Sequence, residues 1–238
     1  MEEVNFIDPL GPAPQKTLHF IWIADCSGSM HGKKIEQLNM SIREAIPPTR
    51  EECLKNPFSK MLVRAIKFSN GAQWHVGKPI PIENFDWKPL TAGGRTDLGK
   101  AFRELKKELT VEKLGKRNLP PVLVLLSDGN PTDDWDIALQ DFNDSDWGKT
   151  GRTVRAAIAV GRDANKEVLA KFTGNIEMVF EVNGAQQLKD VILWASVVLS
   201  SHVSSGKSEL NTSSSSSTTT PLPAKPQIRP LSDEEEIW

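Results

Sequence analysis

The sequence contains few of the residues that most enzymes and transition-metal sites require. Among its 238 residues are only two cysteines and four histidines. Cys26 and Cys53 form no CxxC pair and have no His-rich pair near them, so the spacing of a zinc site is absent, and two such cysteines suit a reducing compartment. None of the histidines is a convincing base for a nucleophile. They are His19, His31, His75 and His202.

An excess of one charge and long apolar runs are also lacking. Lys and Arg total 29 against 31 Asp and Glu, a formal net charge of −2, and no basic patch with interleaved aromatic residues occurs. We therefore expect neither nucleic acid nor a membrane as a partner. No apolar run reaches spanning length, and the acidic start Met1–Asn5 lacks the features of a signal peptide. These observations predict a cytoplasmic protein.

What the sequence does contain is a regular alternation of strand-like and helical segments. This pattern predicts an α/β fold, with a doubly wound, mostly parallel central sheet and helices on both faces. Pro47 and Pro48 should stop the first helix. The tight-turn signal Asn70-Gly71 predicts one antiparallel edge strand, residues 72–76. The other strands are expected at 17–24, 61–68, 122–126, 154–160 and 177–182, and the helices at 33–46, 96–109, 135–142, 166–172 and 186–201.

Changes in composition predict three parts: an N-terminal extension (1–14), a folded domain (15–203) and a Ser/Thr/Pro-rich tail (204–238). We expect the tail to be disordered because it has little apolar surface to bury. It ends with the acidic run Asp233–Glu236, then Ile237 and Trp238. One interpretation is a solvated tail without function. The alternative is a short motif that docks on a partner through Ile237 and Trp238.

The segment Asp25-Cys26-Ser27-Gly28-Ser29 lies between the first predicted strand and the first predicted helix. Alternate residues of such a turn can aim one carboxylate and two hydroxyls beyond the C-terminal edge of the sheet, where open α/β folds bind ligands. Oxygen donors suit Mg²⁺, Ca²⁺ or Mn²⁺. The same residues are also typical of an ordinary helix N-cap, and this segment alone does not decide between the two.

Two further segments favour the metal site. Residues 91–99 form a glycine-rich loop in which Thr96 is a third hydroxyl, and Ser127-Asp128-Gly129 follows the buried-type strand 122–126. Each alone is as typical of a cap or a turn. All three segments lie at predicted strand-to-helix junctions and contribute only oxygen donors. Together they indicate one shared site at the edge of the sheet.

With these residues the sequence resembles a von Willebrand factor A (VWA) domain over about residues 15–203. The metal ion-dependent adhesion site (MIDAS) of that family reads DxSxS, then a Thr in a Gly-rich loop, then an Asp in a strand-end DG. The resemblance implies that Mg²⁺, or alternatively Mn²⁺ or Ca²⁺, is bound and captures a carboxylate of another protein. Arg95, before Thr96, departs from the commoner Gly-Gly-Thr. The implied metal ligands are Asp25, Ser27, Ser29, Thr96 and Asp128.

Residues 93–99 and 128–135 resemble more closely the bacterial tellurium-resistance-associated VWA proteins. This resemblance implies an adaptor without enzyme activity in a bacterial phosphorylation or stress-response system, with a Ser/Thr kinase and a PP2C-type phosphatase as partners.

The alternative is an enzyme, a Mg²⁺-dependent phosphatase or phosphotransferase that uses Asp25 as its nucleophile. Such phosphotransferases have a second Asp two residues further on, where this sequence has Ser27. A thiol phosphatase using Cys26 would need an Arg near the far end of the loop to bind phosphate, and Gly32 and Lys33 stand there instead.

The tryptophans fall into two groups. Trp22 and Trp194 lie in periodic apolar segments and are predicted to belong to the core. A cluster of the remaining four near the metal edge would indicate a partner interface. These four have polar sequence neighbours and are Trp74, Trp87, Trp135 and Trp147.

Overall fold

The protein forms one six-stranded sheet with the strand order β3-β2-β1-β4-β5-β6. The computed structural model describes residues 15–57, 59–115, 118–149, 152–204 and 224–226. All neighbouring strands are parallel except β2 and β3, which form an antiparallel hairpin at one edge. The predicted fold class and edge strand are therefore confirmed. The strands are β1 (Lys16–Asp25), β2 (Ser59–Ser69), β3 (Gly71–Pro81), β4 (Val122–Ser127), β5 (Val154–Val160) and β6 (Val179–Val182).

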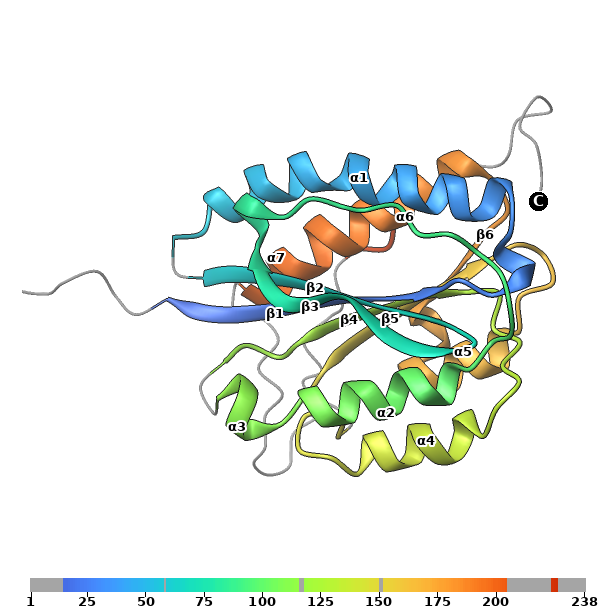
Figure 1. Cartoon of the computed structure of the whole chain (residues 1–238). Helices are drawn as coiled ribbons and strands as arrows, with labels where there is room; N and C mark the ends of the chain where they lie inside the picture. The colour runs from blue at the N-terminus through green and yellow to red at the C-terminus, as the bar shows by residue number, and fades with distance from the viewer. Residues whose placement is uncertain (1–14, 58, 116–117, 150–151, 205–223, 227–238) are drawn as a thin grey trace, which may run out of the picture.

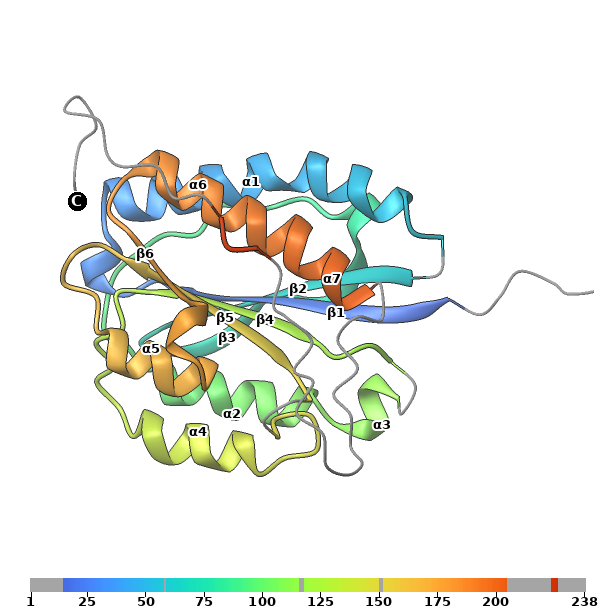
Figure 2. The same cartoon turned by 180° about the vertical axis from the view of Figure 1, so that it is seen from behind.

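Helices cover both faces of the sheet (Figure 1, Figure 2). On one face lie α1 (Lys33–Leu54) and α6 (Ala185–Trp194), with a π-helical turn (Ala195–Leu199) and α7 (Ser200–Ser204) continuing α6. On the other lie α2 (Leu98–Glu108), α4 (Trp135–Asn143) and α5 (Lys166–Thr173). Short helical segments complete the chain: η1 (Gly28–Met30), η2 (Ile82–Asn84), α3 (Val111–Leu114) and η3 (Ile176–Met178). In the part of the chain described, no helix is long and apolar enough to cross a membrane.

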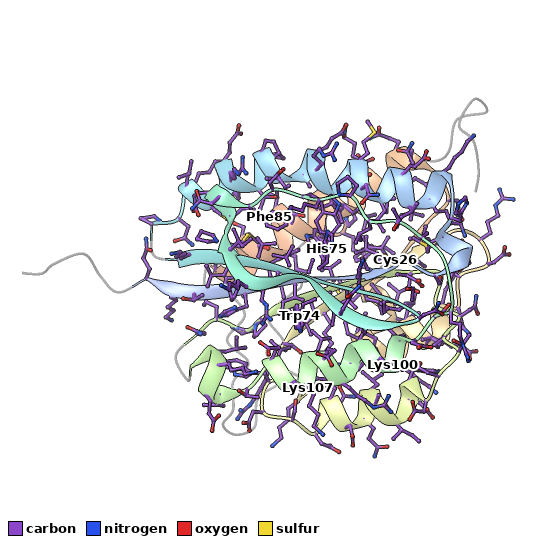
Figure 3. All side chains as sticks on the ribbon, viewed as in Figure 1. Cys26, Trp74, His75, Phe85, Lys100 and Lys107 are labelled. Atoms are coloured by element: carbon purple, nitrogen blue, oxygen red, sulfur yellow. The ribbon has the colours of Figure 1, made fainter. Side chains whose placement is uncertain are left out.

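Two hydrophobic layers follow from the alternation of side chains along the strands. On β1, Phe20 and Trp22 pack toward α1 and α6, whereas Ile21 and Ile23 pack toward α2 and α5. The same alternation separates Trp74 from His75 on β3 (Figure 3). Both faces of the central strands are buried, so these strands are apolar almost throughout, as expected for a parallel sheet between two helical layers.

The prediction that Pro47 and Pro48 end the first helix is wrong, because α1 continues to Leu54. Pro47 and Arg43 are exposed, so the Arg43 carbonyl that lost its amide partner lies on the solvent side of the helix. The following turn is held by one side-chain bond within the helix and one to another segment. Thr49 donates to the Ala45 carbonyl at 2.6 Å, and Arg50 donates through Nε to the Ile82 carbonyl at 2.9 Å.

One other expectation changes in detail, and the structure decides the place of two tryptophans that the sequence left open. The helix predicted at 186–201 contains the π-helical turn at 195–199 instead of running uniformly. Trp87 is 2% exposed and Trp147 9% exposed, so both are core residues rather than surface ones. Trp87 is buried without an unpaired polar atom because its indole Nε1 donates to Asn39 Oδ1 at 2.9 Å. The four tryptophans with polar sequence neighbours therefore form no surface cluster.

The strand order determines where the site lies. Chain order reverses between β1 and β4, which are adjacent and parallel, and open α/β sheets bind ligands outside the carboxyl ends of strands at such a switch point. Ala24 pairs with Leu126, so Asp25 and Ser127 end the two strands at the same level. The loops that follow both strands thus open side by side at one edge of the sheet.

Candidate metal centre

Asp25 is the buried centre of the site. Its carboxylate is fully buried and accepts two hydrogen bonds. Oδ1 accepts from the Ser27 amide at 2.8 Å, and Oδ2 accepts from the Ser127 hydroxyl at 2.5 Å. Ser127 Oγ in turn accepts from the Gly129 amide at 2.8 Å. These bonds orient the Asp25 side chain and join the ends of β1 and β4.

The two predicted serine ligands lie on a short helical turn directly after β1. Ser27 precedes η1 and is buried, whereas Ser29 within η1 is exposed. Their hydroxyl oxygens are 3.0 Å apart. Ser27 is the N-cap residue of η1 but makes no side-chain capping bond, so the helix-cap interpretation of this segment is not what the structure shows. The two hydroxyls instead bond to each other, and Ser27 also bonds to Asp25.

The glycine-rich loop is attached to this turn by its backbone. The Gly28 amide donates to the Gly94 carbonyl at 3.0 Å, and the Gly93 amide donates to the Cys26 carbonyl at 2.8 Å. Gly94 has φ +88°, and a Cβ on it would lie 2.7 Å from Asn70 Nδ2, so a side chain would meet both strain and a clash. Close approach of the two loops therefore requires glycine here.

Arg95 does not disturb this loop. Its amide donates to Asn70 Oδ1 at 2.9 Å, and its side chain is exposed. Thr96, the predicted third hydroxyl, is buried and joined to the loop after β4, because its amide donates to Thr132 Oγ1 at 3.2 Å and its carbonyl accepts from the Thr132 amide at 2.9 Å. The extra residue is accommodated by the hairpin turn that carries Asn70.

Asp128 is the second carboxylate of the site and follows β4. It is 3% exposed, and its backbone carbonyl accepts from the Asn165 amide at 2.7 Å. Its Oδ1 atom is buried and has no hydrogen-bond partner among the described residues. A buried carboxylate oxygen without a donor is costly, so this atom requires a partner that the protein itself does not supply there.

The two carboxylates repel each other. The pKa of Asp25 is raised to about 6, mainly by burial and in addition by the charge of Asp128, while hydrogen bonds from Ser127 and Ser27 act in the opposite direction. A cation between the loops would offset this repulsion and stabilise both charged forms. The donors of this site are carboxylate and hydroxyl oxygens, which fit a hard divalent ion.

Several residues that hold the site together were not predicted as functional. Asp97 Oδ2 accepts from the Gly71 amide at 2.9 Å and from Lys100 Nζ at 2.6 Å, which joins the hairpin turn to the start of α2. Asp133 accepts from the amides of Gly99 and Lys100 at 3.0 and 3.1 Å. Figure 3 labels Lys100 on α2. Only the Gly and Asp content of these loops hinted at such roles, because the bonded partners are 26 to 34 residues apart, except for Lys100 with Asp97.

The structure brings all five predicted ligands to one edge, through bonds among the three loops that carry them. Within the described ranges no group of three or more His, Cys, Asp and Glu side chains is placed to hold a metal, so no zinc-type cluster occurs there. His31 is exposed at the end of η1 and His19 is buried in β1. The predicted partner anchors Ile237 and Trp238 lie outside the described residues.

The family model of the von Willebrand factor type A domain matches residues 82–193. This range includes Thr96 and Asp128 and begins after the turn that contains Asp25, Ser27 and Ser29. The turn with these three residues lies outside the match, and its place at the end of β1 is given by the fold. The match covers just under half of the chain, and the six-stranded architecture is a VWA-like fold. Domains of this class typically mediate protein–protein interaction.

Solved structures with the same fold come from varied sources. The ArnB paralog VWA2 from Sulfolobus acidocaldarius is 19% identical (TM-score 0.55) and is matched over 76% of this chain and 45% of that one. The pilus adhesin SpaC from Lactobacillus rhamnosus GG is 13% identical (TM-score 0.60) and is matched over 77% of this chain and 31% of that one. Proximal thread matrix protein 1 from the mussel byssus was solved with a zinc-occupied MIDAS motif. It is 14% identical (TM-score 0.56) and is matched over 80% of this chain and 47% of that one.

These identities show the fold alone, and this chain spans less than half the length of each of the three proteins. A search of curated proteins finds no match.

Proposed function

We propose that Asp25, Ser27, Ser29, Thr96 and Asp128 bind a divalent cation, and that the bound cation captures a carboxylate of a partner protein. The observation that carries this proposal is the buried, unpaired Asp128 Oδ1 beside the buried Asp25 carboxylate. A cation satisfies that oxygen and offsets the repulsion between the two acids. We expect Mg²⁺, with Mn²⁺ and Ca²⁺ as alternatives, because every donor is a hard oxygen.

When bound, the cation supplies positive charge and coordination positions that the protein side chains leave free. The residues of this chain do the positioning. Ser127 and the Ser27 amide orient Asp25. The hydrogen bonds from the Gly28 amide to the Gly94 carbonyl and from the Gly93 amide to the Cys26 carbonyl hold the hydroxyl turn against the glycine-rich loop. Exposed Ser29 at the rim is where a partner side chain can approach. The zinc-occupied motif of the mussel protein supports a divalent cation at this edge of the fold.

Binding is favoured over catalysis. Both oxygens of Asp25 accept hydrogen bonds from the protein, which makes this carboxylate a poor nucleophile for phosphoryl transfer. Ser27 stands where a phosphotransferase would carry its second Asp. A phosphatase assay with and without Mg²⁺ tests this choice, because turnover that disappears in Asp25→Asn would favour the enzyme.

For the biological setting we propose an adaptor in a bacterial phosphorylation or stress-response system, with a Ser/Thr kinase and a PP2C-type phosphatase as partners. The support is the resemblance of residues 93–99 and 128–135 to the tellurium-resistance-associated proteins. Reconstitution with a candidate kinase and phosphatase, in matched Mg²⁺ and EDTA buffers, tests it. Equal binding in both buffers would contradict a metal-dependent adaptor.

The cation itself is tested by isothermal titration of the full chain with MgCl₂ and MnCl₂. We expect binding of one ion that is lost in Asp25→Ala and in Asp128→Asn, with folding checked by circular dichroism. The matched control is Asp163→Asn, an exposed carboxylate in the loop after β5, which should bind as the unmodified chain does. Unchanged binding in both ligand variants would overturn the proposal.

A further inference from the structure

A polar groove of about 380 Å³ adjoins the metal centre on the side of the β2–β3 hairpin. Its lining includes Cys26 and Gly93 from the two loops of the site, together with Lys67, Asn70 and Gln73 from the hairpin. Figure 3 labels Cys26, which follows Asp25. The groove therefore shares two loops with the metal centre, although none of the five predicted ligands lines it.

Lys67 is the charged group of this groove. It lies near the end of β2, is half-buried, and forms no ion pair among the described residues. Arg95, exposed on the glycine-rich loop, is not free in this sense, because its charge helps to lower the pKa of Asp97. A partly desolvated ammonium without a counter-charge favours binding of an anion. The edge thus presents the Lys67 ammonium next to the metal centre, which suits a segment with several carboxylates.

The chain itself contains such a segment in the acidic run Asp233–Glu236, four consecutive carboxylates. The part of the chain shortly before this run is fixed to the domain. The Ala224 carbonyl accepts from Trp194 Nε1 at 2.7 Å, and Lys225 pairs with Glu177 at 3.4 Å. Residues 224–226 therefore lie against the end of α6, on the face of the sheet that α1 also covers (Figure 2).

The acidic run is within reach of the metal edge. Helix α6 begins at this edge with Ala185, and Trp194 is nine residues further along it. Trp194 therefore lies about 14 Å from the edge. From β6 to β2 there are four strand spacings, about 19 Å. The two components combine to about 24 Å, whereas the ten residues from Pro226 to Glu236 span up to about 33 Å.

We propose that the run Asp233–Glu236 binds this edge, with one carboxylate at the metal centre and a second at Lys67. The inference rests on the proposed function, because it uses the same metal. It identifies the chemistry that the edge selects: two or more carboxylates close together in an extended segment. It also means that a partner must compete with the chain's own acidic run for the site.

Paramagnetic relaxation by Mn²⁺ tests this directly in the full-length chain. We expect NMR signals of residues 233–236 to broaden when one equivalent of Mn²⁺ is bound, at high dilution as well as at working concentration. Neutralising the run, with Asp233→Asn and Glu→Gln at 234, 235 and 236, should weaken Mn²⁺ affinity by about tenfold. Lys67→Gln should reduce both the broadening and the affinity, but only when the acidic run is intact.

The matched control is Lys60→Gln, an exposed lysine at the opposite end of β2, which should change neither quantity. If Mn²⁺ binds and Asp25→Ala abolishes its binding, yet the signals of 233–236 stay sharp, the proposal about the acidic run is overturned and the metal site stands. If no Mn²⁺ binds at all, the proposed function itself fails. Broadening that is unchanged in Lys67→Gln would exclude Lys67 as the second anchor.

Discussion

The Ser127 hydroxyl donates a 2.5 Å hydrogen bond to Asp25 Oδ2 across 102 residues of sequence. Ser127 Oγ itself accepts from the Gly129 amide, so one side chain holds both the carboxylate at the end of β1 and the turn after β4. Asp25 and Asp128 are thereby kept buried side by side although their charges repel. Because two like charges are held close together, the site binds more tightly a cation that offsets their repulsion.

Ser127→Ala should therefore weaken metal binding. The change leaves Asp25 Oδ2 and the Gly129 amide without partners, at a cost of about 1–3 kcal/mol in the free energy of unfolding. Mg²⁺ affinity should fall by at least about tenfold, because a misoriented ligand binds less well. Denaturant unfolding and calorimetric titration measure the two effects.

Ser145→Ala is the matched control, since Ser145 Oγ also donates one bond, to the Phe142 carbonyl, and accepts one, from the Gly148 amide. It should lose stability and keep its metal affinity. Equal affinities in the two variants would show that Ser127 has no role in the site.

Mg²⁺ should stabilise the folded chain. At a free concentration one hundred times the dissociation constant, the gain in free energy of unfolding is about 2.7 kcal/mol. Asp128→Asn should abolish most of this gain because it removes one of the two buried charges that the cation neutralises. Thermal unfolding with MgCl₂ and with EDTA measures the difference. A variant that is stabilised as much as the unmodified chain would contradict our assignment of Asp128.

Gly99→Ala should destabilise the start of α2. A Cβ at Gly99 would lie 2.9 Å from Asp133 Oδ2 and 2.9 Å from the Trp135 Cα, and the backbone contact cannot yield easily. We expect a loss of about 1–3 kcal/mol in the free energy of unfolding. Gly77→Ala is the control, because its Cβ would meet only the Trp74 Cβ at 3.6 Å, an ordinary contact. Similar stability of both variants would mean that α2 and α4 shift apart without cost.

Arg155→Lys should be among the more damaging conservative changes. The Arg155 guanidinium is buried, and it donates to Thr153 Oγ1, Asn143 Oδ1 and the carbonyls of Phe172 and Gly148. An ammonium cannot reproduce this planar set of donors, so we expect a loss of about 3 kcal/mol. Arg152→Lys, at an exposed position, should stay within about 0.5 kcal/mol of the unmodified chain. Denaturant unfolding distinguishes the two variants. An Arg155→Lys variant as stable as the unmodified chain would refute the expectation.

His19 should make stability depend on pH. Burial, and in addition the charge of Arg64, lowers its pKa from 6.5 to about 4. The unfolded chain therefore takes up a proton first as the pH falls. The contribution of His19 to stability is complete above about pH 6.5, declines as the pH falls toward 4, and amounts to roughly 3 kcal/mol.

His19→Leu should flatten this part of the stability curve, whereas His31→Gln, at an exposed position, should leave it unchanged. Urea unfolding at pH 4.5 and pH 7 compares the three chains. An equal loss of stability at pH 4.5 in His19→Leu and in the unmodified chain would assign the pH dependence to other groups.

The solved structures bear out the VWA-like fold that the residues at 25–29, 96 and 128 indicated, and the family model matches residues 82–193. The five metal ligands and the docking role of Ile237 and Trp238 stay predictions. Tertiary structure was needed to see how Arg95 fits, since its amide bonds to Asn70 on another turn. It was also needed for Trp87, which has polar neighbours in the sequence and is buried through a bond to Asn39, 48 residues away.

The sequence by itself determined the alternation of strands and helices, the antiparallel edge, and the oxygen-donor residues at the ends of two strands. These depend on side-chain periodicity and on turn residues, which act over a few positions. The continuation of α1 through Pro47 and Pro48, the bond from Ser127 to Asp25, and the unpaired Asp128 Oδ1 were decided only in three dimensions. They depend on contacts between distant segments, because burial, not local preference, determines the cost of leaving a polar atom without a partner.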